Sequence, residues 1–324
     1  MSDRLFFVIP CYNEQEVLPE TAKRLERKAT GLIAAGRISP ESRIVFVNDG
    51  STDGTWEMIK KLHAGNPLFS GVNLSRNRGH QNALLAGLLT VRPYADVTIS
   101  MDADLQDDID ASDEMLSKYY EGVDIVYGVR KARGTDTFFK RTTAQCFYRL
   151  MNFMGARTIY NHADYRLMSR RALDGLNEFG EVNLFLRGIV PMIGYPSDVV
   201  YYERDKRFAG ESKYPFGKML AFAMEGITSL STRPIQMITG LGCVIFLVSL
   251  LILAYSLARH AMGSTVAGWT FLAVSIWAIG GLILLSLGII GEYIGKIYLE
   301  TKARPRFIVE QFLDREHGTR EGRA

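Results

Sequence analysis

The sequence predicts an α/β fold with a mostly parallel sheet, followed by two membrane-spanning helices. In the first part of the chain, short apolar runs alternate with longer segments of helical periodicity. This alternation is typical of a parallel sheet whose faces are covered by helices. Nearer the C-terminus, two uncharged runs at 235–258 and 266–291 are each longer than the ~20 residues that cross a bilayer. A buried hairpin of a soluble protein is the alternative, and two consecutive runs of this length disfavour it.

Composition excludes several classes of protein. The chain has 324 residues and a formal net charge of +3, which is too small to indicate a protein that binds nucleic acid. Cys11, Cys146 and Cys243 are odd in number and widely spaced. They therefore form neither a disulfide framework nor a zinc site, as expected in a reducing compartment. The N-terminus runs directly into a strand-like segment, and we expect no signal peptide.

The expected strands and helices follow one another in alternation. Leu18, Ala22 and Leu25 recur at helical spacing, so the first helix should bury this stripe against the sheet. Ligands of such sheets bind outside the carboxyl ends of the strands, and the residues that follow each strand are the candidates for a site. Strands are expected at 5–9, 43–47, 71–74, 97–101 and 125–127, and helices near 14–35, 52–64, 81–91 and 110–121.

The fourth expected strand delivers two carboxylates, Asp102 and Asp104, where the sequence turns from apolar to polar. Carboxylates at the end of a buried strand need a cation close by. Mg²⁺ or Mn²⁺ fits, because such hard ions take one or two carboxylates and fill their other positions with water and phosphate oxygens of the substrate. An Asp-rich turn or a helix cap is the alternative for this pair alone.

Other strand ends carry further polar residues. Asp49 follows the second strand, where its carboxylate could accept hydrogen bonds from a nucleobase or a ribose. The third strand is followed by 75–82, which places cations and amides at a helix N-terminus and suits a phosphate. Within it, His80 is expected to be structural rather than catalytic. Arg130 directly follows the fifth strand and Arg141 opens a later helix, so both are candidates to face phosphate.

An anion cradle is expected just before the membrane-like sequence. Arg207 and Lys213 are two well-separated cations around a glycine turn, and Ser212 adds a hydroxyl. Because the segment immediately precedes the apolar runs, its expected ligand is an anion at the lipid surface.

The charge pattern predicts a membrane topology. Residues 213–234 are expected to lie in the membrane interface as an amphipathic helix. Lys and Arg flank the two uncharged runs on their outer sides, whereas the connector holds only Arg259 and His260. By the positive-inside rule, both termini and the sheet domain are cytoplasmic. The expected parts are a catalytic domain at 1–212, an interfacial region at 213–234, two transmembrane helices at 235–291 and a cytoplasmic tail at 292–324.

Three motifs at strand ends together carry a family resemblance. They are, in order, Pro10-Cys11-Tyr12-Asn13-Glu14, Val47-Asn48-Asp49-Gly50-Ser51 and Met101-Asp102-Ala103-Asp104-Leu105-Gln106. This set resembles the nucleotide-sugar domain of family 2 glycosyltransferases, which has the GT-A (Rossmann-like) fold. Where that family commonly has Asp-Asp-Gly-Ser, this chain has Asn48 in place of the first acid.

The resemblance implies roles for residues of these motifs. Asp49 would contact the base, and Asp102 the ribose or the metal region. Asp104 with Gln106 would contact the metal and the diphosphate. The metal ligands implied are therefore Asp102, Asp104 and Gln106. The implied nucleotide-sugar site comprises Pro10, Tyr12, Glu14, Asp49, Asp102, Ala103, Asp104 and Arg130.

The resemblance extends from residue 7 to about residue 311. An Arg-x-x-Gly-Glu-Ser-Lys-Tyr segment at 207–214 and a Gly-Glu-Tyr-Ile-Gly segment at 291–295 are similar to polyprenyl-phosphate glycosyltransferases of the bactoprenol glucosyltransferase type. Dolichyl-phosphate mannose synthases are similar in the catalytic half. The bactoprenol subgroup usually has an aromatic residue where Arg78 stands. The resemblance implies a homo-oligomeric enzyme whose lipid phosphate is held by Arg207, Ser212 and Lys213. Arg141, a candidate by its position at a helix start, completes the expected lipid-phosphate residues: Arg141, Arg207, Ser212 and Lys213. The expected location is the cell inner (plasma) membrane, as a multi-pass protein.

These residues support a hypothesis of direct displacement at the anomeric carbon of the sugar by a phosphate oxygen of the lipid. A single displacement inverts the configuration and gives a β-linked product. A phosphate monoester with a second pKa of ~6 is mostly a dianion at neutral pH, so no strong base is required. Asp164 is therefore expected to orient the acceptor or the sugar, unless it simply pairs with Arg166 or Arg170. The expected catalytic residues are Asp102, Asp104, Asp164, Arg207 and Lys213.

The resemblance to the bactoprenol subgroup implies UDP-glucose as the donor, with GDP-mannose, UDP-N-acetylglucosamine and an aminoarabinose donor as alternatives. A processive polysaccharide synthase would carry Gln-x-x-Arg-Trp, but none of Trp56, Trp269 and Trp277 follows an Arg. A dinucleotide oxidoreductase would have Gly-x-Gly-x-x-Gly after the first strand, and 10–14 contains no glycine. A membrane scaffold with a degenerate site is the non-enzymatic alternative, which the intact acidic residues disfavour.

Overall fold

The computed structural model describes residues 2–131, 162–203, 228, 231–262, 269–314 and 320–321. The chain forms two compact units. The first comprises Met1–Tyr148, Arg157–Pro215 and Arg304–Ala324, and the second comprises Arg149–Ala156 and Phe216–Ala303. The first unit therefore includes the C-terminus as well as the N-terminus.

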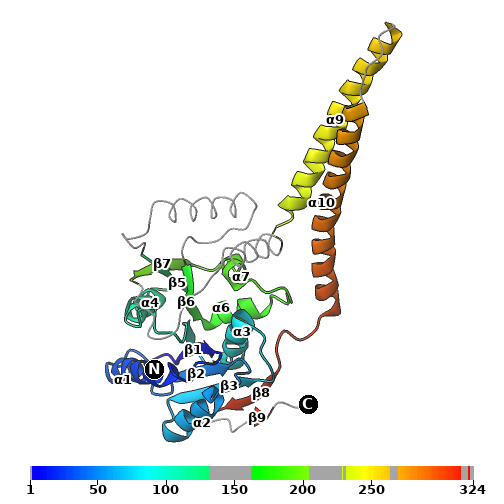
Figure 1. Ribbon diagram of the computed structural model, residues 1–324. Helices are drawn as coiled ribbons and strands as arrows, with labels where there is room; N and C mark the ends of the chain where they lie inside the picture. The colour runs from blue at the N-terminus through cyan, green and yellow to red at the C-terminus, as the bar shows by residue number, and fades with distance from the viewer. Residues whose placement is uncertain are drawn as a thin grey trace. The chain divides into compact units, whose positions relative to one another are not determined.

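The first unit is built on one sheet (Figure 1). Its described strands are β1 Leu5–Cys11, β2 Arg43–Asn48, β3 Phe69–Leu74, β4 Val97–Ser100, β5 Ile125–Arg130, β6 His162–Ser169, β7 Ser197–Tyr202, β8 Val309–Leu313 and β9 Arg320–Glu321. Their order in the sheet is β7-β5-β6-β4-β1-β2-β3-β8-β9. The central strands β4, β1, β2 and β3 are parallel, whereas β6 and β8 run antiparallel to their neighbours. The expected α/β fold with a mostly parallel sheet is confirmed.

The strands form where the sequence is continuously apolar. β1 reads LFFVIPC and β2 reads RIVFVN, and every residue of both strands is buried. A parallel sheet covered on both faces requires such runs rather than alternation of polar and apolar residues. All five expected strands are present, and each end lies within three residues of its expected position.

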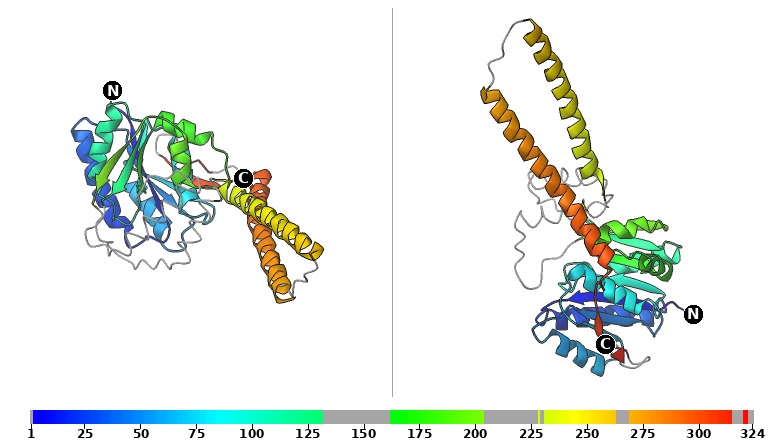
Figure 2. Two further views of the ribbon diagram at one scale, coloured as in Figure 1. Left: turned by 90° about the horizontal axis from the view of Figure 1, so that it is seen from above. Right: turned by 90° about the vertical axis from the view of Figure 1, so that its right-hand side faces the viewer.

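Helices cover both faces of the sheet, as the views in Figures 1 and 2 show. One face is covered by α1 Leu18–Ala34, α2 Thr55–Gly65 and α4 Ala111–Tyr120, and the other by α3 His80–Val91, α6 Arg170–Asn177 and α7 Leu186–Met192. The stripe expected on α1 is buried. The helix α3 lies very close to the sheet, because a Cβ on Gly87 would be 2.6 Å from Val8 Cγ1 and 2.5 Å from Val47 Cγ2.

The strands β6 and β7 were not predicted. β6 lies between β4 and β5 and is antiparallel to both, with Ser100 opposite Arg166. Continuing this register by two residues sets Asp102 opposite Asp164. Because periodicity within one segment does not reveal its partner strand, the sequence alone could not place these two carboxylates together.

The last strands return the chain to the sheet. β8 pairs antiparallel with β3, and β9 pairs antiparallel with β8. Residues 292–324 were expected to form a cytoplasmic tail, and this division of the chain stays a prediction. The part from Arg304 onward belongs to the first unit, and its strands β8 and β9 extend one edge of the sheet.

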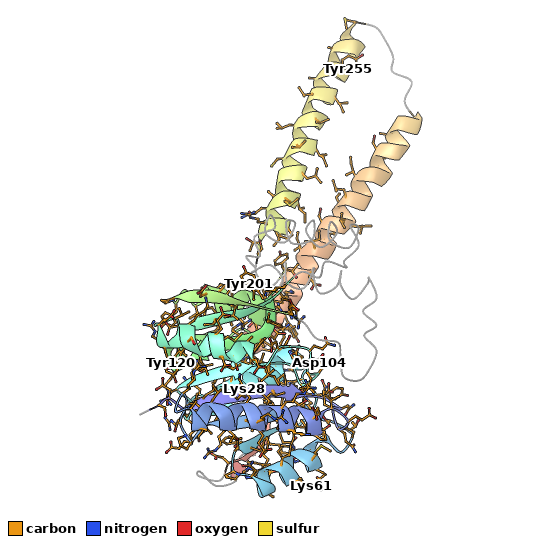
Figure 3. All side chains as sticks on the ribbon, turned by 90° about the vertical axis from the view of Figure 1, so that its left-hand side faces the viewer. Lys28, Lys61, Asp104, Tyr120, Tyr201 and Tyr255 are labelled. Carbon is orange, nitrogen blue, oxygen red and sulfur yellow. The ribbon has the colours of Figure 1, made fainter. Side chains whose placement is uncertain are left out.

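The second unit contains two long helices, α9 Arg233–Ala261 and α10 Trp269–Lys302. They include most of the two uncharged runs, and α10 continues beyond the expected span to Lys302. Among the described residues, one segment, Ile279–Lys302, is long and apolar enough to cross a membrane, with a mean hydropathy of 1.6. Large side chains project from the helices, such as Tyr255 of α9, which is 62% exposed (Figure 3). The presence of two spans stays a prediction.

Candidate active site

Asp102 lies two residues beyond the end of β4, at the carboxyl edge of the sheet. Its side chain is partly buried, and its Oδ1 has no hydrogen-bond partner. Burial raises the pKa of Asp102 to about 6, although the nearby His80 imidazole opposes the rise. Three carboxylates add to it: Asp107, Asp164 and Asp104. The site therefore holds more negative charge at Asp102 than its neighbours compensate.

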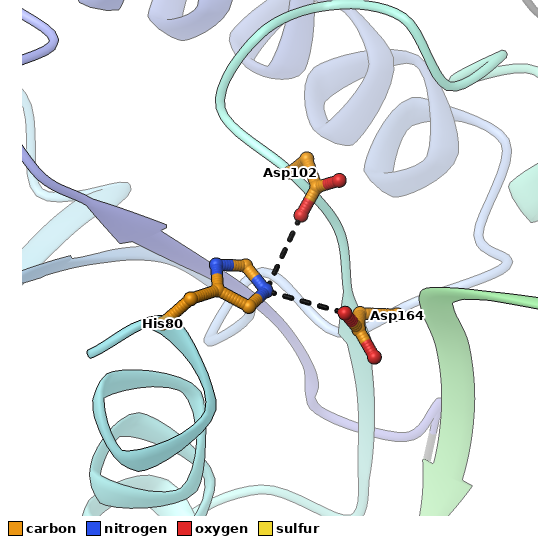
Figure 4. Close-up of side chains that lie close together, drawn as sticks. All are labelled: His80, Asp102 and Asp164. Atoms are coloured by element: carbon orange, nitrogen blue, oxygen red, sulfur yellow. Dashed lines mark ion pairs between the residues drawn. The ribbon is translucent and has the colours of Figure 1, made fainter. Parts of the chain in front are cut away.

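His80 joins Asp102 to Asp164 (Figure 4). Its Nε2 lies 3.5 Å from Asp102 Oδ1 and 3.3 Å from Asp164 Oδ2. Burial lowers the pKa of His80, but the hydrogen bond to Asp164 and the two carboxylate charges outweigh burial, so that the net shift is upward. His80 was expected to be structural, whereas it stands between two acidic residues. It is the first residue of α3, at the carboxyl end of β3, and the rule that singled out Asp49 and Asp102 could have found it.

Asp164 is held by Arg187 of α7. Arg187 Nε lies 3.3 Å from Asp164 Oδ1, and Nη2 lies 3.1 Å from Oδ2, a two-pronged ion pair. Although burial raises the pKa of Asp164, its bonds to His80 and Arg187 hold it well below the usual range. An ionised, paired carboxylate of this kind is suited to orienting a partner and poorly suited to taking up a proton.

The alternative that Asp164 simply pairs with Arg166 or Arg170 is wrong. Arg166 is buried and packs its guanidinium over the ring of Tyr127, 5.3 Å from the centroid. Arg170 instead forms an ion pair with Asp96, at 3.4 Å. Asp164 pairs with Arg187, which is remote in sequence, because its side chain extends from β6 toward α7.

The loop after Asp102 turns sharply at Leu105, whose φ is 57°. Asp104 Oδ1 accepts a hydrogen bond from the backbone N of Gln106, at 3.2 Å. The Ala103 carbonyl accepts one from Thr21 Oγ1 of α1, at 2.8 Å, which fixes the loop to the domain. Among the described residues, the tight cluster of possible metal ligands is His80, Asp102 and Asp164, whose ligand atoms lie within 4.8 Å of one another. Asp104 and Gln106 are not in that cluster, and their role as metal ligands stays a prediction.

Arg130 belongs to a buried network that was not predicted. Asp107 Oδ1 accepts hydrogen bonds from Arg130 Nη2, at 3.1 Å, and from the hydroxyl of Tyr202 on β7. Burial and the Asp107 charge raise the pKa of Tyr202, which keeps its hydroxyl protonated. The same Arg130 nitrogen lies 3.9 Å from Asp102 Oδ2. Arg130 thus contributes positive charge to the acidic site from a fixed position. Asp107 belongs to the acidic run that begins at Asp102, and this run was the feature of the sequence that could have pointed to the network.

Asp49 ends in a different environment. Only 2% of its surface is exposed. Its Oδ1 accepts a hydrogen bond from the backbone N of Arg78 at 2.7 Å, and its Oδ2 accepts one from Gly79 N at 2.9 Å. Burial raises the pKa of Asp49, and these two bonds oppose the rise. Asp49 therefore organises the loop after β3, and its expected contact with a base stays a prediction.

The loop after β1 is fastened to the loop after β2. Asn13 N donates to Ser51 Oγ at 3.0 Å, and Thr52 N donates to Asn13 Oδ1 at 2.9 Å. Glu14 N donates to Thr55 Oγ1 at 3.0 Å. Of the residues expected to bind the nucleotide sugar, Pro10 is buried in β1, Tyr12 is exposed and Glu14 lies at this seam. Four further expected residues, Arg141, Arg207, Ser212 and Lys213, lie outside the described residues.

Comparison with known proteins identifies the family of this chain. Residues 6–176, which include the three strand-end motifs, match the family described as Glycosyl transferase family 2. The chain belongs to this family. The expected resemblance is thereby confirmed, and the chain is a family 2 glycosyltransferase.

Relatives of this glycosyltransferase match it over nearly its whole length. It is 51% identical over 306 residues to the uncharacterized glycosyltransferase YkoT of Bacillus subtilis (strain 168). This match covers 94% of this chain and 91% of YkoT. It is 38% identical over 313 residues to the bactoprenol glucosyl transferase of Shigella phage SfX, covering 95% and 99% of the two chains. Among solved structures, mannosyltransferase PcManGT from Pyrobaculum calidifontis, in complex with GDP-Man and Mn²⁺, matches with a TM-score of 0.42 at 17% identity, covering 92% of this chain and 85% of that one.

Proposed function

We propose that this glycosyltransferase moves glucose from UDP-glucose to a polyprenyl phosphate, with inversion at the anomeric carbon, at the cytoplasmic face of the plasma membrane. The observation that carries the proposal is the 38% identity to a bactoprenol glucosyl transferase over 95% of this chain. That match extends past the sheet domain into the apolar helices, so it supports a lipid acceptor as well as a sugar-nucleotide donor.

The described residues suit a reaction between two anions. The acceptor phosphate is itself the nucleophile and is mostly ionised at neutral pH, so the site needs no strong base. Asp164, kept ionised by Arg187, can orient the acceptor or a sugar hydroxyl. Arg130 brings positive charge within 3.9 Å of Asp102, where a donor diphosphate would add negative charge. Positioning and charge compensation then supply most of the rate.

The acidic site also fits Mg²⁺ or Mn²⁺. Asp102 Oδ1 is buried without a hydrogen-bond partner, and carboxylate oxygens are the ligands that such ions prefer. Asp102 would share the ion either with Asp104 and Gln106, as the family resemblance implies, or with His80 and Asp164, which the fold brings within ligand distance. A bound divalent ion would neutralise the diphosphate leaving group.

We further propose that α9 and α10 both span the membrane and that the sheet domain and both termini are cytoplasmic. The apolar composition of the two helices and the flanking Lys and Arg residues support this topology. The domain boundaries given above belong to this proposal, as does a homo-oligomeric enzyme. Its lipid-phosphate residues would be Arg141, Arg207, Ser212 and Lys213.

The test is transfer of radiolabelled sugar to undecaprenyl phosphate by the full-length chain in detergent, with Mg²⁺, Mn²⁺ or EDTA. We expect UDP-glucose to be used, EDTA to abolish transfer, and Asp104→Ala to lower the rate by about a hundredfold. Asp174→Ala, which removes an exposed carboxylate of α6 paired with Arg92, is the matched control and should keep the wild-type rate.

Each other outcome has a definite meaning. Use of GDP-mannose, UDP-N-acetylglucosamine or an aminoarabinose donor instead would keep the lipid-acceptor reaction and change the sugar. An α-linked product, read from the anomeric coupling constant, would contradict the single displacement. Failure of every donor with a folded protein would favour the non-enzymatic scaffold.

A further inference from the structure

The segment that follows α10 packs against β3 and the loop after it. We call residues 304–313 the C-terminal strap. Ser75 N donates to the Ile308 carbonyl at 3.1 Å, β8 pairs with β3, and Phe312 is buried in the core. The strap therefore lies directly against β3 and the loop after it, which leads to His80 and donates hydrogen bonds to Asp49.

Arg78 makes one connection between the strap and Asp49. Its Nε donates to the Arg306 carbonyl at 2.6 Å, and its Nη2 donates to the Pro305 carbonyl at 2.5 Å. The backbone N of the same residue donates to Asp49 Oδ1 at 2.7 Å. Arg306 in turn donates to the Phe179 carbonyl at 3.0 Å, which fixes the strap on its other side. One residue thus holds the strap with its side chain and Asp49 with its backbone.

A second chain of side-chain hydrogen bonds reaches the same strand tip. Asn73 Nδ2 donates to Glu310 Oε2 at 2.7 Å, and Asn48 Nδ2 donates to Asn73 Oδ1 at 2.6 Å. Asn48 Oδ1 then accepts a hydrogen bond from Ser51 N at 3.3 Å. This chain runs from β8 across β3 to β2 and ends beside Asp49.

The two connections meet at the turn after β2, which is tightly packed. Gly50 has a φ of 64°, and a Cβ there would lie 2.5 Å from Asn77 N and 2.6 Å from the carbonyl carbon of Arg76. The turn after β2 is therefore packed on the backbone of the loop after β3. A shift of that loop must move the turn that carries Asp49.

We propose that the C-terminal strap helps to position the residues that bind a nucleoside diphosphate. Arg78 and Asn48 are the positioning residues, and they hold Asp49 and the loop after β3 in the orientation that binds this ligand. This rests on the proposed function. The residue types matter: an aromatic residue at 78 cannot donate to two carbonyls, and an Asp at 48 cannot donate to Asn73 Oδ1. Asn48 and Arg78 both stand where the resembled families usually have another residue type, and both contact this network.

The test measures UDP binding and transfer with the full-length chain in detergent. We expect Arg78→Ala to weaken the affinity for UDP, measured by calorimetry with Mn²⁺, by about tenfold, a loss typical of residues that orient a binding group. The KM for the donor should rise in parallel, while kcat and the KM for the lipid stay within about twofold. Arg78→Lys, which keeps a cation and a donor, should recover part of the affinity. Arg24→Ala, an arginine loss on the exposed face of α1, is the control.

A second measurement tests the connection without ligand. Hydrogen exchange of the Arg78 and Gly79 amides should be about tenfold faster in Glu310→Ala than in the wild type, because the hydrogen bond from Asn73 to Glu310 of the strap is lost. Wild-type UDP affinity in Arg78→Ala, or an equal fall in kcat and in kcat/KM at unchanged affinity, would overturn the proposal. A wild-type chain that binds no nucleoside diphosphate would instead mark failure of the proposed function, and the exchange rates would still decide whether the strap controls the loop.

Discussion

Asp49 and Asp102 hold equivalent places, each just beyond a parallel strand, yet the fold surrounds them in opposite ways. Both oxygens of Asp49 accept backbone N–H bonds. Asp102 has one oxygen without a hydrogen-bond partner, and the nearest cationic nitrogens, on His80 and Arg130, lie 3.5 and 3.9 Å away. The two oxygens of Asp49 already hold a loop. Asp102 keeps an oxygen that can bind a ligand directly.

The largest expected effect comes from Asp102→Asn. The substitution keeps the shape of the side chain and removes the charge that a metal or a donor would need. We expect the transfer rate at saturating substrates to fall by about a thousandfold. A loss of less than tenfold would contradict a direct role of Asp102 in binding the metal or the donor.

The same substitution should stabilise the metal-free fold. The pKa of Asp102 is raised to about 6 from an unfolded value of about 3.9, so the native state binds its proton more tightly. Stability therefore falls as pH rises from about 4 to about 6, and the cost is fully present above that range. In EDTA at pH 8 we expect Asp102→Asn to raise the free energy of unfolding by roughly 2 kcal/mol, with little change at pH 4. Thermal unfolding at the two pH values measures this.

Asp49→Asn should shift stability in the opposite direction. An amide offers one acceptor oxygen, and its NH₂ group would face the other of the two N–H groups that Asp49 now binds. We expect a loss of about 1 kcal/mol at pH 8, because the two opposed N–H donors and the broken bond together outweigh the relief of burying a charge. The measurement is the same unfolding experiment in EDTA, so the two variants are compared directly. Stabilisation by both substitutions would remove the distinction between the two sites.

The centre of the sheet could be predicted because its strands are continuous apolar runs. β1 to β5 and the helices between them follow from local periodicity alone. β6 and β8 could not be predicted, since each pairs with strands that are remote in sequence and run in the opposite direction. The strand-end rule located Asp49, Asp102 and Arg130 correctly at the carboxyl edge.

The partners of these residues were harder to predict than their positions. Arg187 reaches Asp164 only because α7 packs on the same face as α3, and the sequence offered only the nearby arginines as candidate partners. His80 was set aside because a lone histidine carries little information in a sequence. The position of His80 in the site becomes apparent only from the antiparallel register of β4 and β6, which brings the Asp102 and Asp164 carboxylates to its ring.

The smallest expected effect is the pH dependence that His80 contributes without metal. Its pKa is raised above the unfolded value of about 6.5, so its stabilisation is fully present below that pH and is lost as pH rises through the folded pKa. Because the imidazole is 44% exposed, we expect His80→Gln to cost only about 0.5 kcal/mol at pH 6 and nothing at pH 9. In the Asp102→Asn background the cost at pH 6 should shrink, since one of the two carboxylates that attract the imidazolium is gone. An equal cost at both pH values would show that His80 acts through packing, and an equal cost in both backgrounds would assign the attraction to Asp164 alone.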